Sequence, residues 1–305
     1  MNIPDFLIKW LGSFLYNRQQ RMKIGKETSA WSPVVAGVPQ GTLLGPVTFL
    51  VQINDLSTSI SSVKYVDDTT LWEICDITKE DTNLQCATEQ VIQWCKDNRM
   101  SLNTEKTKTM VISFSKLTPK FQPITIDNTQ IEDINTFKLL GVKINNKLSW
   151  EEHVNYICKK AAQRLYFLVL LKRAGIKEKD IVSVYCSIIR SVLEYADVIW
   201  HPGLTKSQCQ AIEHIQKRVM GIIYNGVNYT KALEQSGLQK LDTRREDHCR
   251  TFYANMQDPK HKLYKYLPPK RPLLNLRKQR TYEVPKLRTN RPKKSPIYYG
   301  LFKFQ

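Results

Sequence analysis

The sequence has little of what stabilises secreted or membrane-spanning proteins. Its seven cysteines are dispersed and include no CxxC pair, which favours reduced thiols in hydrophobic cores over a disulfide framework. No apolar run approaches the roughly 20 residues that span a bilayer, and residues 1–5 lack the basic start of a signal peptide. These absences predict an intracellular protein, nuclear or cytoplasmic, with no membrane partner.

Histidine and cysteine are also too irregularly spaced for a zinc module. The residues that come nearest to a ligand set are His201, Cys209, His214, His248 and Cys249. Their spacings match no zinc finger or knuckle, so a zinc site is the disfavoured interpretation.

Negative charge is scarce relative to positive charge. The 305 residues contain 46 Lys and Arg against 28 Asp and Glu, a formal net charge of +18. This excess favours a polyanionic partner, with nucleic acid ahead of an anionic membrane surface. After Asp258 the sequence has one acid, Glu283. Residues 258–305 are therefore expected to form a basic, Pro-rich and loosely ordered tail without a core of its own.

Two adjacent carboxylates stand between two runs that favour β-structure. Residues 63–66 read Val-Lys-Tyr-Val and residues 69–72 read Thr-Thr-Leu-Trp, which predicts a tight hairpin with Asp67 and Asp68 at its tip. Neighbouring carboxylates repel one another unless a cation lies between them, so a pair on rigid strands suits a hard ion such as Mg²⁺. Asp-Asp is also a common turn dipeptide on solvated surfaces, and the pair alone leaves that alternative open.

A glycine-rich loop precedes the hairpin. Residues 37–46 read Gly-Val-Pro-Gln-Gly-Thr-Leu-Leu-Gly-Pro, and the chain continues through Phe49 and residues 54–56 (Asn-Asp-Leu) to the Tyr-x-Asp-Asp box. The order of these stretches resembles motifs B and C of the reverse transcriptase palm, most closely in non-LTR (LINE-type, jockey-like) retrotransposons. The resemblance implies that Asp67 and Asp68 are catalytic metal ligands for two-metal nucleotidyl transfer.

The same resemblance implies substrate-binding residues in the loop and the hairpin. These residues are Gly37, Pro39, Gln40, Gly41 and Tyr65. The two glycines would allow a close backbone approach while the proline stiffens the loop, although an ordinary helix-entry turn is the alternative.

Residues 94–107 have the spacing W-x-x-x-N-x-M-x-L-N-x-x-K-T, which resembles motif D of the family. There the lysine, here Lys106, is a proposed proton donor to the leaving pyrophosphate. Without the pattern, a single lysine after a turn is usually only solvated.

Periodicity predicts the elements that surround these motifs. The expected helices cover residues 4–18, a segment from Pro46, residues 79–98 and several segments of 152–224. The expected β-structure comprises hairpins at residues 21–35 and 121–131 and a strand over 110–114. Residues 137–144 read as a strand with Gly141 in its interior, and they resemble the stretch that holds the primer strand.

Basic residues are expected opposite the apolar stripes of the helices after residue 152. These candidate nucleic-acid contacts are Lys159, Lys160, Arg164, Lys217 and Arg218. A basic helix face is ordinarily only solvated. Beside a palm it suits a duplex backbone, and the segment resembles the thumb of jockey-type elements.

The predicted fold class is α+β. Residues 1–150 are expected to form an incomplete polymerase palm, an antiparallel sheet with packed helices, followed by a helical thumb at 151–257 and the basic tail at 258–305. In the resembling family, motif A supplies another aspartate and precedes the glycine-rich loop. The single aspartate of residues 1–36 is Asp5, and the residues around it do not match motif A.

The sequence therefore predicts the C-terminal part of an RNA-directed DNA polymerase, with an RNA template and a DNA primer as partners. Mg²⁺ binding is expected to be weak or absent without motif A, and the chain alone is expected to be inactive. The alternative is a non-catalytic nucleic-acid-binding protein from a decayed or repurposed element.

Overall fold

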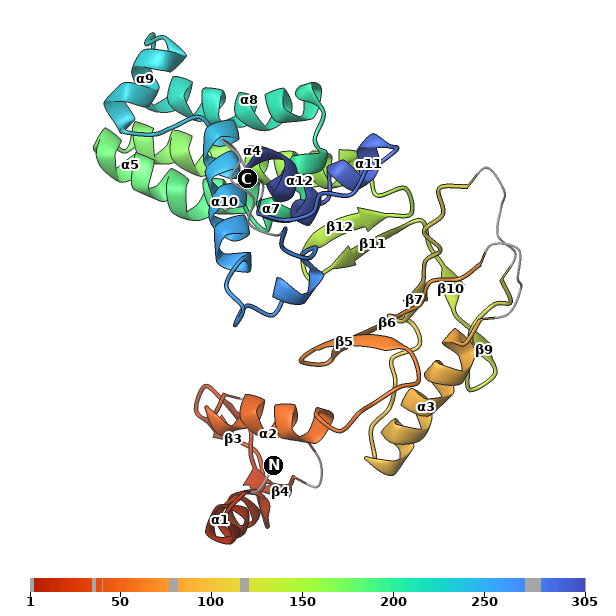
Figure 1. Ribbon diagram of the computed structural model, residues 1–305. Coiled ribbons are helices and arrows are strands. Elements are labelled where there is room, and N and C mark those ends of the chain that lie inside the picture. Colours follow the sequence, from red (N-terminus) through yellow and green to blue (C-terminus); the bar gives the residue numbers. More distant parts are fainter. Residues whose placement is uncertain are drawn as a thin grey trace. The chain divides into compact units, whose positions relative to one another are not determined.

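The chain folds into two units, shown in the computed structural model of Figure 1. The first unit comprises Met1–Lys108 and Pro119–Glu132, and the second comprises Thr109–Thr118 and Asp133–Gln305. Helices alternate with two-stranded sheets, which is the mixed content of the predicted α+β class. No described helix combines the length and the apolar composition of a membrane span. The residues that the structure describes are 3–34, 37–39, 41–76, 82–115, 121–271 and 281–304.

The described residues of the first unit form helices and short antiparallel strand pairs. Its elements are α1 (Asp5–Leu15), β1 (Gln19–Gln20), β2 (Lys23–Ile24), β3 (Glu27–Thr28), β4 (Ser32–Pro33), α2 (Leu44–Ile53), β5 (Ser61–Tyr65), β6 (Asp68–Trp72), α3 (Leu84–Asp97), β8 (Thr125–Ile126) and β9 (Thr129–Gln130). The pairs are β1 with β4, β2 with β3, β5 with β6, and β8 with β9, all antiparallel. Strand β7 (Lys108–Thr109) pairs with β10 (Glu132–Asp133).

Two small cores hold the first unit together. One joins the C-terminal end of α2 to α3 through the buried side chains of Ile53, Leu56, Val91 and Cys95, with Leu71 of β6 packed against them. The other packs the β8–β9 hairpin against α3 through the buried residues Ile124, Ile126 and Ile131. The hairpin turns at Asp127 and Asn128 as predicted, and both residues have positive φ.

Helix α1 forms where the apolar periodicity predicts it, yet none of its side chains is buried. The rings of Trp10 and Phe14 stack with their centroids 6.3 Å apart, and Trp10 remains 55% exposed. The pattern therefore predicted the helix correctly, whereas the packing expected for its apolar face is not present among the described residues.

Two predicted strands differ from the structure. The strand expected over residues 110–114 is wrong, because pairing ends at Thr109 in β7 and Val111, Ile112 and Phe114 are exposed. The strand expected over residues 137–144 is instead a hairpin of β11 (Thr136–Leu139) and β12 (Val142–Asn145). Leu140 and Gly141 have φ values of 46° and 90° and form its two-residue loop, a turn that favours glycine.

The second unit is mainly helical. After β11 and β12 its elements are α4 (Glu151–Arg173), α5 (Glu178–Tyr185), the π-helical turn η1 (Cys186–Arg190), α6 (Ser191–Leu193), α7 (Asp197–Trp200), the 3₁₀ turn η2 (His201–Gly203), α8 (Lys206–Ile223), α9 (Tyr229–Ser236), α10 (Leu241–Met256), the 3₁₀ turn η3 (Tyr264–Tyr266), α11 (Asn290–Lys293) and α12 (Pro296–Lys303). Its largest core joins α4, α5, α8 and α9 to β12.

A π-helical turn keeps one apolar stripe of this core facing inward. Ile181, Tyr185, Ile189 and Leu193 are fully buried at successive steps of four residues. Four residues exceed the 3.6 of an α-helical turn, so a straight α-helix would rotate the later positions away from the core. The wider turn at Cys186–Arg190 offsets that rotation.

The expectation of a loosely ordered tail is wrong for residues 281–304. Helix α12 packs on α10, where Leu301 joins a core with Met256 and Tyr282. The Tyr299 hydroxyl donates to Glu246 at 2.5 Å, and Lys303 pairs with the same carboxylate at 2.8 Å. The described apolar side chains of the tail thus share a core with α10. The basic run at residues 277–280 lies outside the described residues.

Candidate active site and nucleic-acid interface

Asp67 and Asp68 lie at the tip of the β5–β6 hairpin, as the sequence predicts. Tyr65 and Asp68 are register partners, which leaves Val66 and Asp67 as a two-residue loop. Val66 has a φ of 54°, a conformation that is strained for a β-branched residue and that hairpins normally reserve for glycine. Strained backbone concentrates at functional positions, which makes the tip a candidate site.

The hairpin has an outward face and an inward face. Tyr65 and Asp68 are opposite one another and so share a face with Val63 and Trp72, all of them exposed. Lys64 and Leu71 point to the other face, where Leu71 packs against the core of α2 and α3. One sheet face therefore presents Tyr65 and Asp68 to solvent while the other anchors the hairpin.

Lys64 fixes the hairpin to the end of α2. Its Nζ donates to the carbonyl oxygens of Ile53, Asn54 and Leu56 at 2.9, 3.1 and 2.9 Å. These carbonyls lie at or just beyond the helix C-terminus, where helix carbonyls lack intrahelical partners and carry partial negative charge. Sequence reasoning missed this role, although a lysine at an inward strand position was a signal for it.

Glu73, directly after β6, holds the hairpin to the start of α3. Its carboxylate accepts hydrogen bonds from the backbone N–H groups of Leu84 at 3.1 Å and Asn83 at 3.3 Å, and it also accepts one from the Thr82 hydroxyl. Burial raises the pKa of Glu73 and these hydrogen bonds lower it, leaving it below the usual value. A lysine at one helix C-terminus and a glutamate at another N-terminus both match the helix dipoles. The two contacts tie both strands of the hairpin to helices.

Replacing Lys64 by methionine is expected to destabilise the first unit by about 1–3 kcal/mol, because three helix-end carbonyls lose a charged donor at a half-buried position. Urea unfolding followed by circular dichroism measures the change. Lys96→Met is the matched control, since Lys96 pairs with Asp127 at 3.2 Å while both side chains are at least 60% exposed, and such pairs contribute little. Equal effects of the two substitutions would contradict the anchoring role.

The glycine-rich loop owes its glycines to backbone conformation. Gly37 and Gly41 have φ values of 86° and 77°, and a Cβ at either position would meet no atom within 4 Å. Positive φ therefore accounts for both glycines, and the close backbone approach expected at these positions stays a prediction. Gly45 is needed for another reason, because a Cβ there would clash with the carbonyl oxygen of the buried Pro39. Gln40 lies outside the described residues.

Lys106 is exposed at the end of a local turn. The Asn103 side chain accepts the Lys106 backbone N–H at 3.0 Å, and the Thr107 hydroxyl donates to the Asn103 carbonyl at 2.8 Å. The asparagine and threonine of the motif D spacing thus shape the turn that presents the lysine. The structure records no contact between Lys106 and the hairpin aspartates among the residues it describes.

The two aspartates fit a magnesium ion as one part of a ligand set. Both are exposed carboxylates, and Mg²⁺ is commonly bound by one or two carboxylates together with waters and substrate phosphates. The described ranges contain no group of three or more His, Cys, Asp or Glu side chains that could hold a metal ion, either at this hairpin tip or elsewhere.

A cluster of lysines surrounds Tyr156 in the second unit. The Nζ atoms of Lys138 on β11, Lys143 on β12 and Lys160 on α4 lie 5.4, 5.1 and 6.0 Å from the centroid of its ring. A hydrogen bond with Lys138 and the charges of the three lysines lower the pKa of the Tyr156 hydroxyl. None of the three lysines forms an ion pair within the described residues. Three positive charges therefore lie around one half-buried ring, which gives this surface a concentrated positive potential.

The other predicted nucleic-acid contacts divide into two kinds. Lys159 on α4 and Lys217 and Arg218 on α8 are exposed. Arg164 is half-buried, and its Nη1 donates to the carbonyl of Ile188 in the π-helical turn. At least one guanidinium nitrogen of Arg164 therefore stabilises the fold, whereas the side chains of Lys159, Lys217 and Arg218 are exposed to solvent.

Tyr195 fixes the tip of the β11–β12 hairpin, a role that sequence reasoning did not predict. Its hydroxyl donates to the Leu140 carbonyl at 2.9 Å, and a Cβ at Gly141 would lie 3.1 Å from its ring. The contact holds the strands that carry Lys138 and Lys143, which are directly opposite one another and repel.

Residues 1–144 match the family described as reverse transcriptase (RNA-dependent DNA polymerase). Residues 150–191 match the N-terminal segment described for alkylated DNA repair protein alkB homolog 8. No solved structure matches the chain.

Three curated proteins of Drosophila melanogaster are each 24% identical to the chain. The probable RNA-directed DNA polymerase from transposon BS aligns with 88% of this chain and 31% of its own length. The probable RNA-directed DNA polymerase from transposon X-element aligns with 70% and 24%. The RNA-directed DNA polymerase from mobile element jockey aligns with 71% and 25%. The predicted resemblance to non-LTR retrotransposon reverse transcriptases is confirmed, and the chain spans about a quarter to a third of these relatives.

Proposed function

We propose, because residues 1–144 belong to the reverse transcriptase family, that this chain is a segment of a non-LTR retrotransposon RNA-directed DNA polymerase. The observation that carries the proposal is the pair Asp67 and Asp68 at the strained, outward tip of a hairpin, following a glycine-rich loop in which Gly37 and Gly41 have positive φ. On this proposal residues 1–150 form part of the palm and residues 151–257 form the thumb.

The hairpin and loop supply the nucleotide site. In a complete polymerase, where another aspartate joins the ligand set, Asp67 and Asp68 would hold Mg²⁺ through their carboxylate oxygens, and the bound ion would supply charge stabilisation at the reacting phosphate. Gly37, Pro39, Gln40, Gly41 and Tyr65 contact the incoming nucleotide or the template. Lys106, exposed on its turn, donates a proton to the leaving pyrophosphate.

The second unit grips the duplex of RNA template and DNA primer. Lys138, Lys143 and Lys160 around Tyr156 provide a concentrated positive site for backbone phosphates. Lys159, Lys217 and Arg218 extend the positive surface on α4 and α8. Arg164 contributes by holding the π-helical turn as well as through its charge. Phosphate contacts of this kind carry no sequence information, so binding is expected without sequence preference.

A second function is a nucleic-acid-binding protein without chemistry. The observation that favours it is the lysine cluster around Tyr156, which is assembled within the second unit alone. Both functions predict duplex binding, so only primer extension that requires Asp67 would establish the polymerase over the binding protein.

A melting experiment tests the metal site. Asp68→Asn is expected to leave the thermal midpoint unchanged or to raise it by up to a few degrees, because two neighbouring carboxylates repel when no cation lies between them. Millimolar Mg²⁺ is expected to change the wild-type midpoint little. Asp127→Asn is the matched control, since Asp127 is also an exposed hairpin-tip aspartate but pairs with Lys96. A clear stabilisation by Mg²⁺ that Asp68→Asn removes would show a fully assembled site and contradict the expectation.

A further inference from the structure

Helix α4 carries two exposed aromatic rings next to one another. Tyr166 is 61% exposed and Phe167 is 53% exposed, and Leu170, one turn further along, is also exposed. The centroids of the two rings lie 6.4 Å apart, with an angle of 57° between their planes. Neither ring belongs to a hydrophobic core of the residues that the structure describes. These three side chains, the aromatic surface of α4, therefore form an apolar patch that the described part of the chain leaves open to solvent.

The two rings continue rows of side chains that begin with lysines. Side chains three or four residues apart are neighbours on the surface of a helix. Lys160, Gln163 and Phe167 form one such row of α4, and Lys159, Gln163 and Tyr166 form the row beside it. Lys160 is one of the lysines of the cluster described above. The aromatic surface thus lies about 10 Å along the helix from that lysine cluster.

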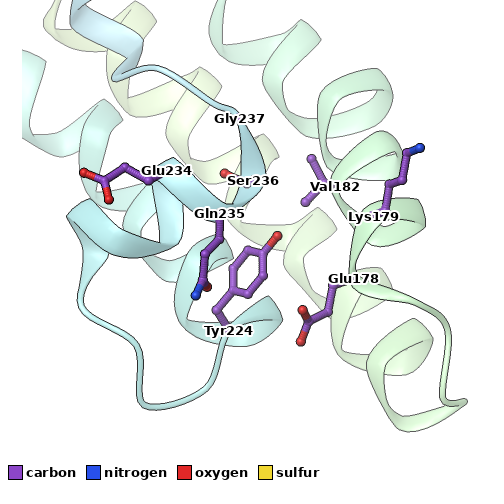
Figure 2. A pocket seen from close by; sticks show the side chains of 8 residues that line it. All are labelled: Glu178, Lys179, Val182, Tyr224, Glu234, Gln235, Ser236 and Gly237. Atoms are coloured by element: carbon purple, nitrogen blue, oxygen red, sulfur yellow. The ribbon is translucent and has the colours of Figure 1, made fainter.

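Another positive charge follows the rings at the C-terminal end of α4. Arg173 is exposed and lies three residues beyond Leu170. Its neighbour Lys172 is used by the fold, because its Nζ pairs with Glu178 at 3.0 Å and donates to the Ile223 carbonyl at 2.7 Å. Glu178 lines a pocket among α5, α8 and α9, shown in Figure 2, and no residue of the aromatic surface lines that pocket. The charge available beside the rings is therefore that of Arg173.

The charge around the aromatic surface has a single sign. Residues 153–177 contain six lysines and arginines and no aspartate or glutamate. A second copy of this chain on the same surface would bring these like charges together, which disfavours a symmetric dimer through α4. Exposed rings within a positive segment instead suit a polyanion that has flat apolar groups of its own, and a nucleic acid combines phosphates with bases.

We propose that the aromatic surface of α4 stacks the bases of a single-stranded nucleic acid whose phosphates lie against Lys159, Lys160 and Arg173. This inference rests on the nucleic-acid binding proposed for the second unit. The bases of a duplex are already stacked on one another, so the rings fit unpaired nucleotides that continue from a duplex held at the lysine cluster. Every base has a π-face, so stacking is expected without sequence preference.

Fluorescence anisotropy with a labelled oligodeoxythymidine of about twelve nucleotides tests the proposal on the full chain. The comparison ligand has the same number of phosphates and abasic sites in place of the bases. It is expected to bind at least about tenfold more weakly, because each base stacked on a ring contributes about fivefold to a hundredfold in affinity. Oligouridine of the same length distinguishes RNA from DNA as the strand, and the ring variants described next are expected to weaken whichever binds more tightly.

Tyr166→Leu combined with Phe167→Leu is expected to weaken binding of the oligonucleotide at least about tenfold and to leave affinity for the abasic strand unchanged. Leucine keeps apolar bulk but has no π-face, so the loss separates stacking from hydrophobic contact. Phe167→Trp keeps a ring and is expected to bind as tightly as the wild type or more tightly. Both rings are largely exposed, so melting curves should show folded variants, and Phe167→Leu alone provides the test if the double variant is unstable.

Tyr266→Leu is the matched control variant. Tyr266 is 54% exposed in η3 of the same unit, and the Nζ of Lys265 lies 5.1 Å from the centroid of its ring. This ring is therefore also exposed beside a lysine, but it lies outside α4. Its replacement should leave affinity for the oligonucleotide unchanged, and a loss as large as in the α4 variants would place base stacking elsewhere.

Other results would overturn the proposal in distinguishable ways. Equal affinity for the thymidine and abasic strands would show that bases are not recognised. Unchanged affinity in the double variant, while the chain still binds blunt duplexes, would overturn this inference and leave the proposed function standing. Failure to bind strands and duplexes alike would overturn both. A dimer in sedimentation that dissociates in the double variant would assign the aromatic surface to a second copy of the chain.

Discussion

No template-dependent primer extension is expected from the purified 305-residue chain, with Mg²⁺ or with Mn²⁺. Two-metal nucleotidyl transfer needs carboxylates that bridge both ions across the attacking and leaving oxygens. Asp67 and Asp68 are adjacent in the sequence and share one hairpin tip, and the described residues contain no group of three or more metal-ligating side chains. Two neighbouring carboxylates leave most ligand positions of the ions to water. We therefore expect the chain to show none of the metal-dependent extension rate of a complete site.

The measurement is extension of a labelled primer on RNA and on DNA templates. Extension by the wild type that disappears in Asp67→Ala and persists in Asp127→Asn would contradict the prediction and establish polymerase activity in this chain. Extension that survives Asp67→Ala would instead come from a contaminating polymerase. Asp127→Asn suits the comparison because it removes one carboxylate from a different hairpin tip of the same unit.

Local sequence patterns predicted the hairpin of the site because its conformation is decided locally. β-Favouring residues flank the Asp-Asp pair, and the strands formed with the aspartates at the tip. The Asp127–Asn128 turn was equally accessible, since those residue types tolerate positive φ. Gly141 was predicted in the interior of a strand but lies in a turn, because a single glycine is compatible with both.

Contacts between distant segments were beyond the sequence patterns. Lys64 and Glu73 tie the hairpin to two helices through hydrogen bonds to backbone groups, which leave no residue-specific pattern at the partner positions. Helix α12 packs on α10 through apolar side chains, which the basic composition of the tail did not indicate. Tyr195 reaches Leu140 across 55 residues of sequence. Such contacts are settled by tertiary packing, and periodicity along one segment does not report them.

The chain is expected to bind duplexes of RNA and DNA without sequence preference, with an affinity that falls steeply with salt. A surface that makes six to ten phosphate contacts loses about 10³-fold or more in affinity between 50 and 200 mM salt. The exposed or half-buried lysines and arginines of β11, β12, α4 and α8 supply that many charges. Fluorescence anisotropy with heteroduplexes of unrelated sequence measures both properties, and a flat salt response would contradict the prediction.

Neutralising the lysine cluster should reduce this binding without harming the fold. Lys138→Gln, Lys143→Gln and Lys160→Gln together are expected to weaken binding by at least about tenfold and to lower the salt slope by about 2 to 3 units, because each phosphate contact contributes roughly 0.9. The melting temperature of this triple variant should not fall, since Lys138 and Lys143 are opposed like charges in the hairpin.

The control variant removes the same charge from exposed lysines elsewhere in the second unit, Lys206, Lys231 and Lys240. If both triple variants lose affinity equally, net charge alone governs binding and the cluster around Tyr156 is not a phosphate site.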